Sequence, residues 1–164
     1  SLLFGVSAFT LHVIVAFALP LAAFGIDGWN LPLQINGTTI PYSLTFLEGT
    51  LVNLGVIYLV LTAMIGLTLF LSSKMKSPYL VLIIVVPALF LPMFLSPNGT
   101  SGLLNLLIFL TPYQSLVPRF GSYISYQFGP AVFDAFTMRA IVYAVLALVL
   151  LPLARLGFRK HQVT

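Results

Sequence analysis

Long apolar blocks that carry almost no charge constrain this chain more than any other feature. Four of them are long enough to cross a bilayer as helices, and they lie at residues 2–24, 49–71, 79–95 and 137–156. An α-helix of about 20 apolar residues crosses the roughly 30 Å hydrocarbon core of a bilayer. The chain is 60% hydrophobic and only 6% charged, whereas a soluble domain is about 25% charged. The blocks predict an integral membrane protein and exclude a water-soluble globule.

A fifth apolar stretch, residues 103–110, is too short to cross a bilayer. Prolines 112 and 118 and several tyrosines follow it, so we expect a re-entrant or interfacial segment over about 103–118. The predicted fold is an all-α polytopic membrane helix bundle with four transmembrane spans and an external re-entrant helical hairpin. It forms a single transmembrane domain over residues 1–164. Because the first apolar block begins at once with no basic leader, we expect a piece of a longer chain.

The placement of the basic residues predicts the orientation in the cell membrane. Five of the seven Lys/Arg residues lie in the short connection with Lys74 and Lys76 or at and beyond the end of the last span, and two lie in or beside the other connections. This asymmetry predicts that the lysine connection and the C-terminus are cytoplasmic. A fifth crossing at 103–118 would separate the lysine connection from the basic C-terminus, so we reject it. The net charge of +4 thus reports membrane orientation, and no nucleic-acid partner is predicted.

Polar residues within the spans have both structural and functional interpretations. His12, near the middle of the first span, is a neutral side chain bonded to a neighbouring helix or a functional ionisable group. Asn53 is an interhelical hydrogen-bonding residue or part of a substrate path. Pro87 produces a static bend or a gating kink in the third span. Thr45 and Glu48 have the spacing of a capping box, which predicts the start of the second span.

Charged residues at the span ends also allow two interpretations. Asp134 stabilises the positive end of the following helix, and Arg139 extends to the outer headgroups; alternatively the two form a gate. Lys74 and Lys76 serve orientation alone or also contact a cytoplasmic partner. The sequence has no phosphate-binding loop of the G-x-x-x-x-G-K-[ST] type, no cysteine, and three carboxylates far apart in the chain. We therefore predict a protein that is not an enzyme and has no metal site and no cofactor.

The order of these features, together with the amino-acid sequence at the span edges, resembles the last four of six spans in ABC-2 type transporter permeases of Gram-positive bacteria. The segments that carry the resemblance are LTLFLSSKMKSPYLVLIIVVPALFLPMFL, LTPYQSL, SYQFGPAVFDAFTMRAIVY and LPLARLGFRKHQVT. The resemblance covers essentially the whole chain. The chain differs from the family in one respect, because it lacks the first two spans and the cytoplasmic loop that normally docks the ATPase.

The resemblance implies a permease subunit that exports a lipid, a peptide or another amphiphile by alternating access. Its implied partners are a separate ATP-binding subunit, a second permease subunit in a homodimer or heterodimer, and membrane lipid. The external hairpin would form the outer gate, which places Tyr113 and Tyr126 at that gate beside Asp134 and Arg139. His12, Asn53 and Pro87 would be moving parts of the translocation path.

Two other functions fit the sequence. A secondary transporter fragment would need coupling ions, and such proteins commonly carry buried acids or broken helices near the membrane midplane; here every acid lies at an external span end. A membrane scaffold or interaction protein that transports nothing would also show packed apolar helices. Dependence on a co-expressed ATPase separates these alternatives from the permease.

Overall fold

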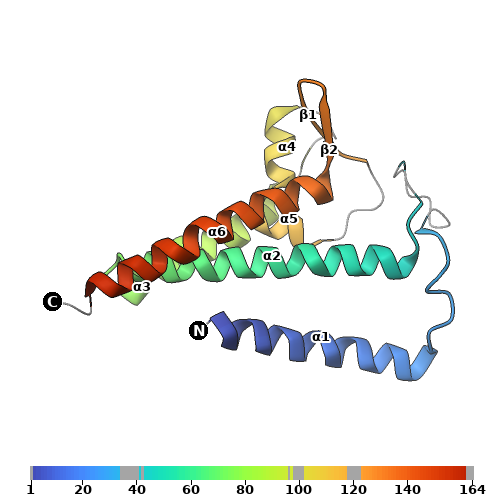
Figure 1. Ribbon diagram of the computed structural model, residues 1–164, viewed down its shortest axis with the longest axis horizontal. Helices are drawn as coiled ribbons and strands as arrows, with labels where there is room; N and C mark the ends of the chain where they lie inside the picture. The colour runs from blue at the N-terminus through green and yellow to red at the C-terminus, as the bar shows by residue number, and fades with distance from the viewer. Residues whose placement is uncertain are drawn as a thin grey trace.

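The computed structural model describes residues 2–33, 41, 43–95, 97, 102–117 and 123–161, and this part of the chain is mostly helical (Figure 1). The elements, in chain order, are α1 (Leu2–Phe24), α2 (Phe46–Ser72), α3 (Pro78–Phe90), the 3-10 helix η2 (Leu91–Phe94), α4 (Leu103–Phe109), α5 (Pro112–Leu116), the strands β1 (Ser125–Phe128) and β2 (Ala131–Asp134), and α6 (Ala135–His161).

Three of these helices are long and apolar enough to cross a membrane: α1, α2 and α6. They coincide with the predicted blocks 2–24, 49–71 and 137–156, so those helices are confirmed. The block at 79–95 forms the shorter apolar helix α3, which continues into η2 as far as Phe94. The described chain therefore has the helices of a membrane protein, and the predicted segment 103–118 contains two short helices, with residue 118 outside the described residues.

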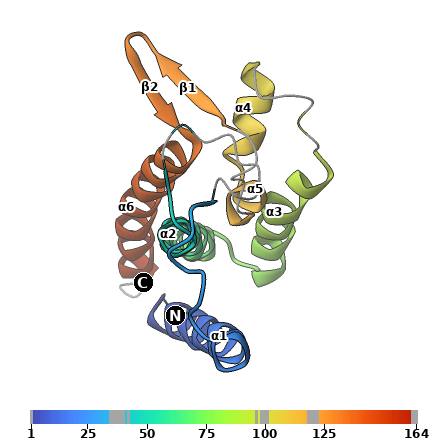
Figure 2. The same ribbon diagram turned by 90° about the vertical axis from the view of Figure 1, so that its right-hand side faces the viewer.

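The centre of the fold is the packing of α2 against α6, which run side by side (Figures 1 and 2). Their facing side chains form one buried cluster, made of Val56, Val60, Ala63, Phe136, Tyr143 and Ala147. Small residues allow the close approach. A Cβ built on Gly66 would lie 3.3 Å from the Cβ of Leu150, and one on Gly157 would collide with the side chain of Ser73. Gly55, in contrast, has open space around it.

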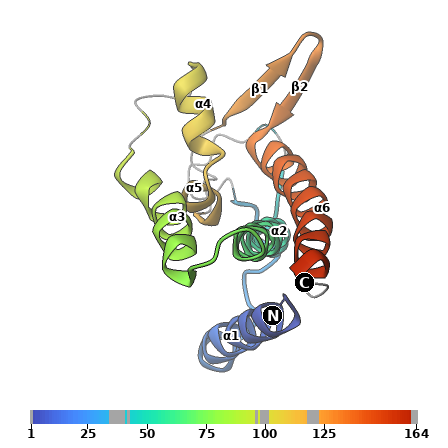
Figure 3. The ribbon, with the colours of Figure 1, turned by 90° about the vertical axis from the view of Figure 1, so that its left-hand side faces the viewer.

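Helix α1 lies along α2 and buries little of its surface (Figures 1 and 3). Its contacts with α2 centre on Tyr58. The hydroxyl groups of Thr10 and Tyr58 are hydrogen-bonded at 2.8 Å, and the rings of Phe9 and Tyr58 meet edge to face at 5.1 Å. The rest of α1 presents apolar side chains such as Leu3, Leu11 and Leu19 to the exterior.

The predicted capping box at the start of α2 is confirmed. The Glu48 amide donates to the Thr45 hydroxyl at 3.2 Å, and the Thr45 amide donates to the Glu48 carboxylate at 2.9 Å. The next two free amides of the helix find carbonyls in the preceding turn. Phe46 N donates to Leu31 O at 3.0 Å, and Leu47 N donates to Trp29 O at 3.1 Å. The turn that follows α1 is thereby fixed to the first turn of α2.

A two-stranded antiparallel hairpin precedes α6, and the sequence analysis did not predict it. Tyr126 pairs with Phe133 and Phe128 with Ala131, which leaves Gly129 and Pro130 as a two-residue turn. Gly129 has a φ of +61°, a value that favours glycine. A second buried cluster joins α4 to the hairpin and its two flanking residues, and it consists of Phe109, Ile124, Tyr126 and Ala135.

The two ends of the molecule carry different connections (Figure 1). The connection between α2 and α3, which contains Lys74 and Lys76, lies at the same end as the C-terminus of α6. Contact between Ser73 and Gly157 joins these two segments. The turn between α1 and α2, the β-hairpin and the start of α6 lie toward the other end.

Candidate functional site: the helix break between α4 and α5

Helix α4 ends abruptly, and the sequence explains why. In a continuous helix the amide of residue 112 would donate to the carbonyl of Ile108, but Pro112 has no N–H and its ring clashes with that carbonyl. Thr111 is accordingly extended, with φ −64° and ψ 154°, and α5 begins at Pro112. The break leaves the carbonyls at the end of α4 without their helical partners, and such groups need other donors when water is absent.

Two of these carbonyls are satisfied locally. Leu107 O accepts from the Leu110 amide at 3.1 Å. Ile108 O accepts from both the amide and the hydroxyl of Thr111, at 3.1 and 2.6 Å. The tightened last turn and the threonine thus replace the donor that Pro112 lacks.

Three side chains from distant parts of the chain satisfy the others. The Tyr126 hydroxyl on β1 donates to Leu106 O at 2.9 Å. On α6, Arg139 Nε donates to Phe109 O at 3.1 Å, and the Tyr143 hydroxyl donates to Leu110 O at 2.7 Å. We call Tyr126, Arg139 and Tyr143 the carbonyl clamp. With the local donors it gives each carbonyl from residue 106 to residue 110 a partner.

The clamp is buried and electrostatically matched to the end of α4. Arg139 is 1% exposed and lies 6.0 Å from the centroid of the Phe136 ring. A cation is favourable at the C-terminal end of a helix, where the carbonyls carry partial negative charge. Burial, partly offset by the positive charge of Arg139, raises the pKa of the Tyr126 phenol to about 12. Tyr126 therefore stays protonated and keeps its donor hydrogen over the physiological pH range.

The prediction that Arg139 extends to the outer headgroups is wrong, because the residue is buried and its Nε donates to Phe109 O on α4. Asp134 does lie at the start of α6 as predicted, and its Oδ1 accepts from the Thr137 amide at 2.6 Å. The two side chains thus contact different elements. Asp134 caps α6, while Arg139 fixes the end of α4.

The two predicted gate tyrosines have different surroundings. Tyr126 is buried in the clamp, whereas Tyr113 is half-buried on α5, which packs against α2, α3 and η2 (Figures 2 and 3). None of the contacts described for residues 102–117 and 123–161 joins Tyr113 to Tyr126. The α4–α5 segment is therefore held on one side by β1 and α6 and on the other by α2 and α3.

The remaining predicted residues lie outside the clamp. His12 is exposed on α1, and no hydrogen bond involves it within the part of the chain that the structure describes. Asn53 is half-buried on α2, and its Oδ1 is buried without a hydrogen-bonding partner among the described residues. Pro87 lies inside α3, and the amide of Leu91 donates to its carbonyl where η2 begins. Lys74 and Lys76 are exposed.

Sequence reasoning missed Tyr143, although a signal was present. Arg139 and Tyr143 are four residues apart, so they share one face of a helix. They are the two residues with long donor side chains on that face near the start of an otherwise aliphatic span. Their acceptors lie about 30 residues earlier in the chain, and no local pattern identifies them.

Among the described residues no group of His, Cys, Asp and Glu side chains could hold a metal ion. Comparison of the chain with models of protein families, with curated proteins and with solved structures finds no match. The geometry of the clamp and the arrangement of the helices are the observations from which a function is proposed.

Proposed function

We propose that this chain is the membrane-spanning permease part of an ABC-2 type ATP-binding cassette transporter. It would export a lipid, a peptide or another amphiphile by alternating access, powered by a separate ATPase subunit. The proposal draws on the resemblance of the span-edge segments and on the arrangement of the elements. A short basic connection lies at one end of the molecule. A broken helical segment is held against the first part of α6, away from that connection.

In this proposal the chain crosses the cell membrane four times, through α1, α2, α3 with η2, and α6. The thirteen residues of α3 and the four of η2 extend over about 28 Å at the usual rises of the two helix types, close to the roughly 30 Å hydrocarbon core. Helices α4 and α5, of seven and five residues, are far too short to cross. The lysine connection and the C-terminus would be cytoplasmic, on the side of the ATPase.

The observation that carries the proposal is the complete pairing of the carbonyls at the α4–α5 break. Within a bilayer, non-helical backbone is tolerated only where protein covers it or where it lines a cavity. Here side chains of β1 and α6 supply the donors. A segment built in this way suits an outer gate that enters the membrane from outside without crossing it.

The clamp also gives such a gate a mechanical connection. Two of its three side chains belong to α6, which packs along α2. A shift of α6 would therefore carry the end of α4 with it, because both Arg139 and Tyr143 hold that end. The exposed apolar faces of α1 and α3 are suited to lipid or to a second permease subunit.

Co-purification tests the proposal. The tagged protein is expressed in its source cell, extracted in a mild detergent at low salt, and its partners are identified by mass spectrometry. We expect a stoichiometric ATPase with a Walker A motif, and ATP turnover by the complex. A chain that purifies without any ATPase would contradict the proposal and favour a scaffold or a secondary carrier.

A further inference from the structure

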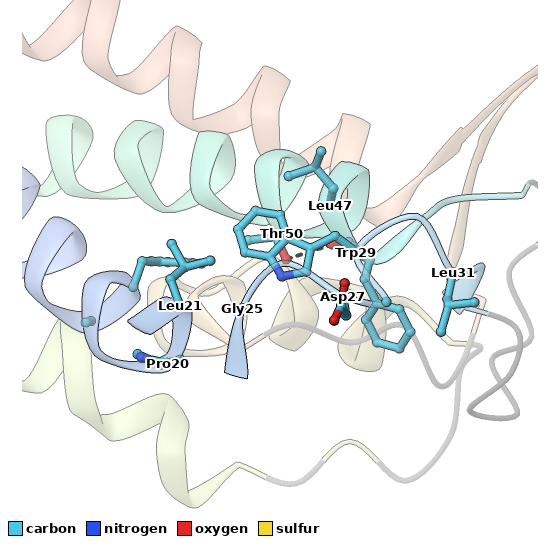
Figure 4. Close-up of a pocket in the computed structure, with 12 residues that line it drawn as sticks. Pro20, Leu21, Gly25, Asp27, Trp29, Leu31, Leu47 and Thr50 are labelled. Carbon is cyan, nitrogen blue, oxygen red and sulfur yellow. Dashed lines mark hydrogen bonds between the residues drawn. The ribbon is translucent and has the colours of Figure 1, made fainter. Parts of the chain in front are cut away.

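A pocket of about 640 Å³ lies between the end of α1 and the start of α2. Its walls come from the last turns of α1, the turn over residues 25–31 and the first turn of α2 (Figure 4). This volume falls within the range of about 300–1,000 Å³ that is typical of small-molecule sites. No residue of the carbonyl clamp lines the pocket, and the pocket plays no part in the proposed gate.

Backbone hydrogen bonds fix the shape of this pocket. Gly25 ends α1 with a φ of +70°, and its amide donates to Leu21 O at 2.9 Å. Gly28 has a φ of +85°, which lets the turn reverse toward α2. The bond from Leu47 N to Trp29 O then attaches the turn to α2. The pocket is therefore a preformed feature of the fold.

The lining is apolar except for the side chains of Asp27 and Thr50 and the indole N–H of Trp29. Ala16, Phe17, Pro20 and Leu21 of α1 form an apolar wall. In the view of Figure 4 the Trp29 indole lies between Leu21 and the carboxylate of Asp27. No hydrogen bond or ion pair involves that carboxylate within the described residues, and no basic side chain lines the pocket.

The charge at this end of the molecule favours a cationic ligand. Glu48 lies in the first turn of α2, next to the lining residues Phe46 and Leu47. The connection between α2 and α3, which contains Lys74 and Lys76, lies at the opposite end (Figure 1). An indole face attracts ammonium groups through its π-electrons, and a carboxylate attracts the same charge.

We propose that this pocket binds a single-chain amphiphile with a cationic ammonium head. The head would lie at Asp27 and Trp29, and the alkyl chain would extend along Ala16, Pro20 and Leu21. Binding here goes beyond the proposed transport function and needs no ATPase. It can therefore succeed or fail independently of the co-purification test.

The position of Trp29 allows a direct measurement, because it is the only tryptophan in the sequence. The protein in maltoside micelles is titrated with dodecyltrimethylammonium brominated at carbon 2, and separately with uncharged 2-bromododecanol. Bromine quenches indole fluorescence on close approach. We expect saturable quenching by the cation at a concentration about fivefold lower than by the alcohol, since an exposed ion pair and a cation–π contact each contribute modestly.

Variants separate the site from general partition into the micelle. Asp27→Asn is expected to reduce the preference for the cation to the part that the Trp29 indole contributes, whereas Asp27→Glu keeps the full preference. Ala16→Phe, which fills the pocket, weakens quenching by both probes. Its matched control, Ala18→Phe, changes an exposed α1 residue that does not line the pocket and leaves quenching unchanged.

Three results would overturn the proposal. Equal quenching by the two probes in the unmodified protein would mean that Trp29 is only an interfacial anchor. A cation preference as large in Asp27→Asn as in the unmodified protein would place the cation elsewhere. Quenching that never saturates would show that no site exists. Far-ultraviolet circular dichroism of each variant confirms that it is folded before it is compared.

Discussion

Arg139 on α6 donates a hydrogen bond from Nε to the carbonyl of Phe109, 30 residues earlier in the chain, at 3.1 Å. Arg139 is 1% exposed, so the bond forms away from water. Buried charges are costly unless they are hydrogen-bonded. This contact therefore gives the arginine a partner and at the same time closes the end of α4.

Replacing Arg139 tests this relationship. Arg139→Gln is expected to lower the free energy of unfolding by about 1–3 kcal/mol, because a buried hydrogen bond from a charged donor is lost. Thermal unfolding in detergent, followed by the fluorescence of Trp29, measures the change. Arg155→Gln, at an exposed position of the same helix, is the control and should unfold as the unmodified protein does. Equal effects of the two variants would argue against a special role for Arg139.

Tyr126→Phe removes one donor of the clamp and keeps the ring. We expect a loss of stability of about 1–3 kcal/mol, since Leu106 O is left buried without the phenol. Tyr79→Phe is the matched control because Tyr79 is 74% exposed on α3. A similar loss for both variants in chemical unfolding would show that the hydroxyl of Tyr126 contributes nothing specific.

The raised pKa of Tyr126 adds a dependence on pH. The folded state holds the Tyr126 proton up to a pKa of about 12, while the unfolded state loses it near the ordinary tyrosine pKa of about 10. Between these two values the folded state binds more protons, so stability falls as pH rises. The fall should be shallower for Tyr126→Phe than for the unmodified protein. Parallel curves of stability against pH would refute this assignment.

Replacing a glycine by alanine is expected to affect stability differently at two positions of the α2–α6 pair. Gly157→Ala should destabilise the protein by about 1–3 kcal/mol, as overpacked cores do, because its Cβ would lie 2.7 Å from the Cβ of Ser73. Gly55→Ala has open space and should be neutral or stabilising by up to about 1 kcal/mol through helix propensity. Both are measured by thermal unfolding, and a destabilising Gly55→Ala would contradict the packing described for α2.

The long helices were predictable because their apolar blocks are about as long as a membrane-spanning helix requires. The start of α2 was also predictable, since Thr45 and Glu48 act within one turn. The β-hairpin was missed, although Tyr126 and Phe128 alternate with polar residues before the turn at Gly129. The aromatic residues there were interpreted as an interfacial feature rather than as a strand.

The carbonyl clamp could not be predicted from local sequence patterns, and the cause here is different. Arg139 was placed at the headgroups because a lone arginine near a span end commonly extends to water. Its real acceptor exists only because Pro112 breaks a helix far away in the chain and leaves carbonyls to be satisfied. Partners created by tertiary packing cannot be inferred from the spacing of residues within one helix.

Labelling of single cysteines from the two sides of the membrane tests the central claim most directly, namely that the α4–α5 segment enters the membrane without crossing it. The sequence has no cysteine, so Gln127→Cys on the β-hairpin and Met75→Cys in the lysine connection give unambiguous signals. With a membrane-impermeant maleimide, Gln127→Cys should react in intact cells and Met75→Cys only after permeabilisation. If both residues react from the same side, then either α4–α5 crosses the membrane or α3 does not, and the account is wrong.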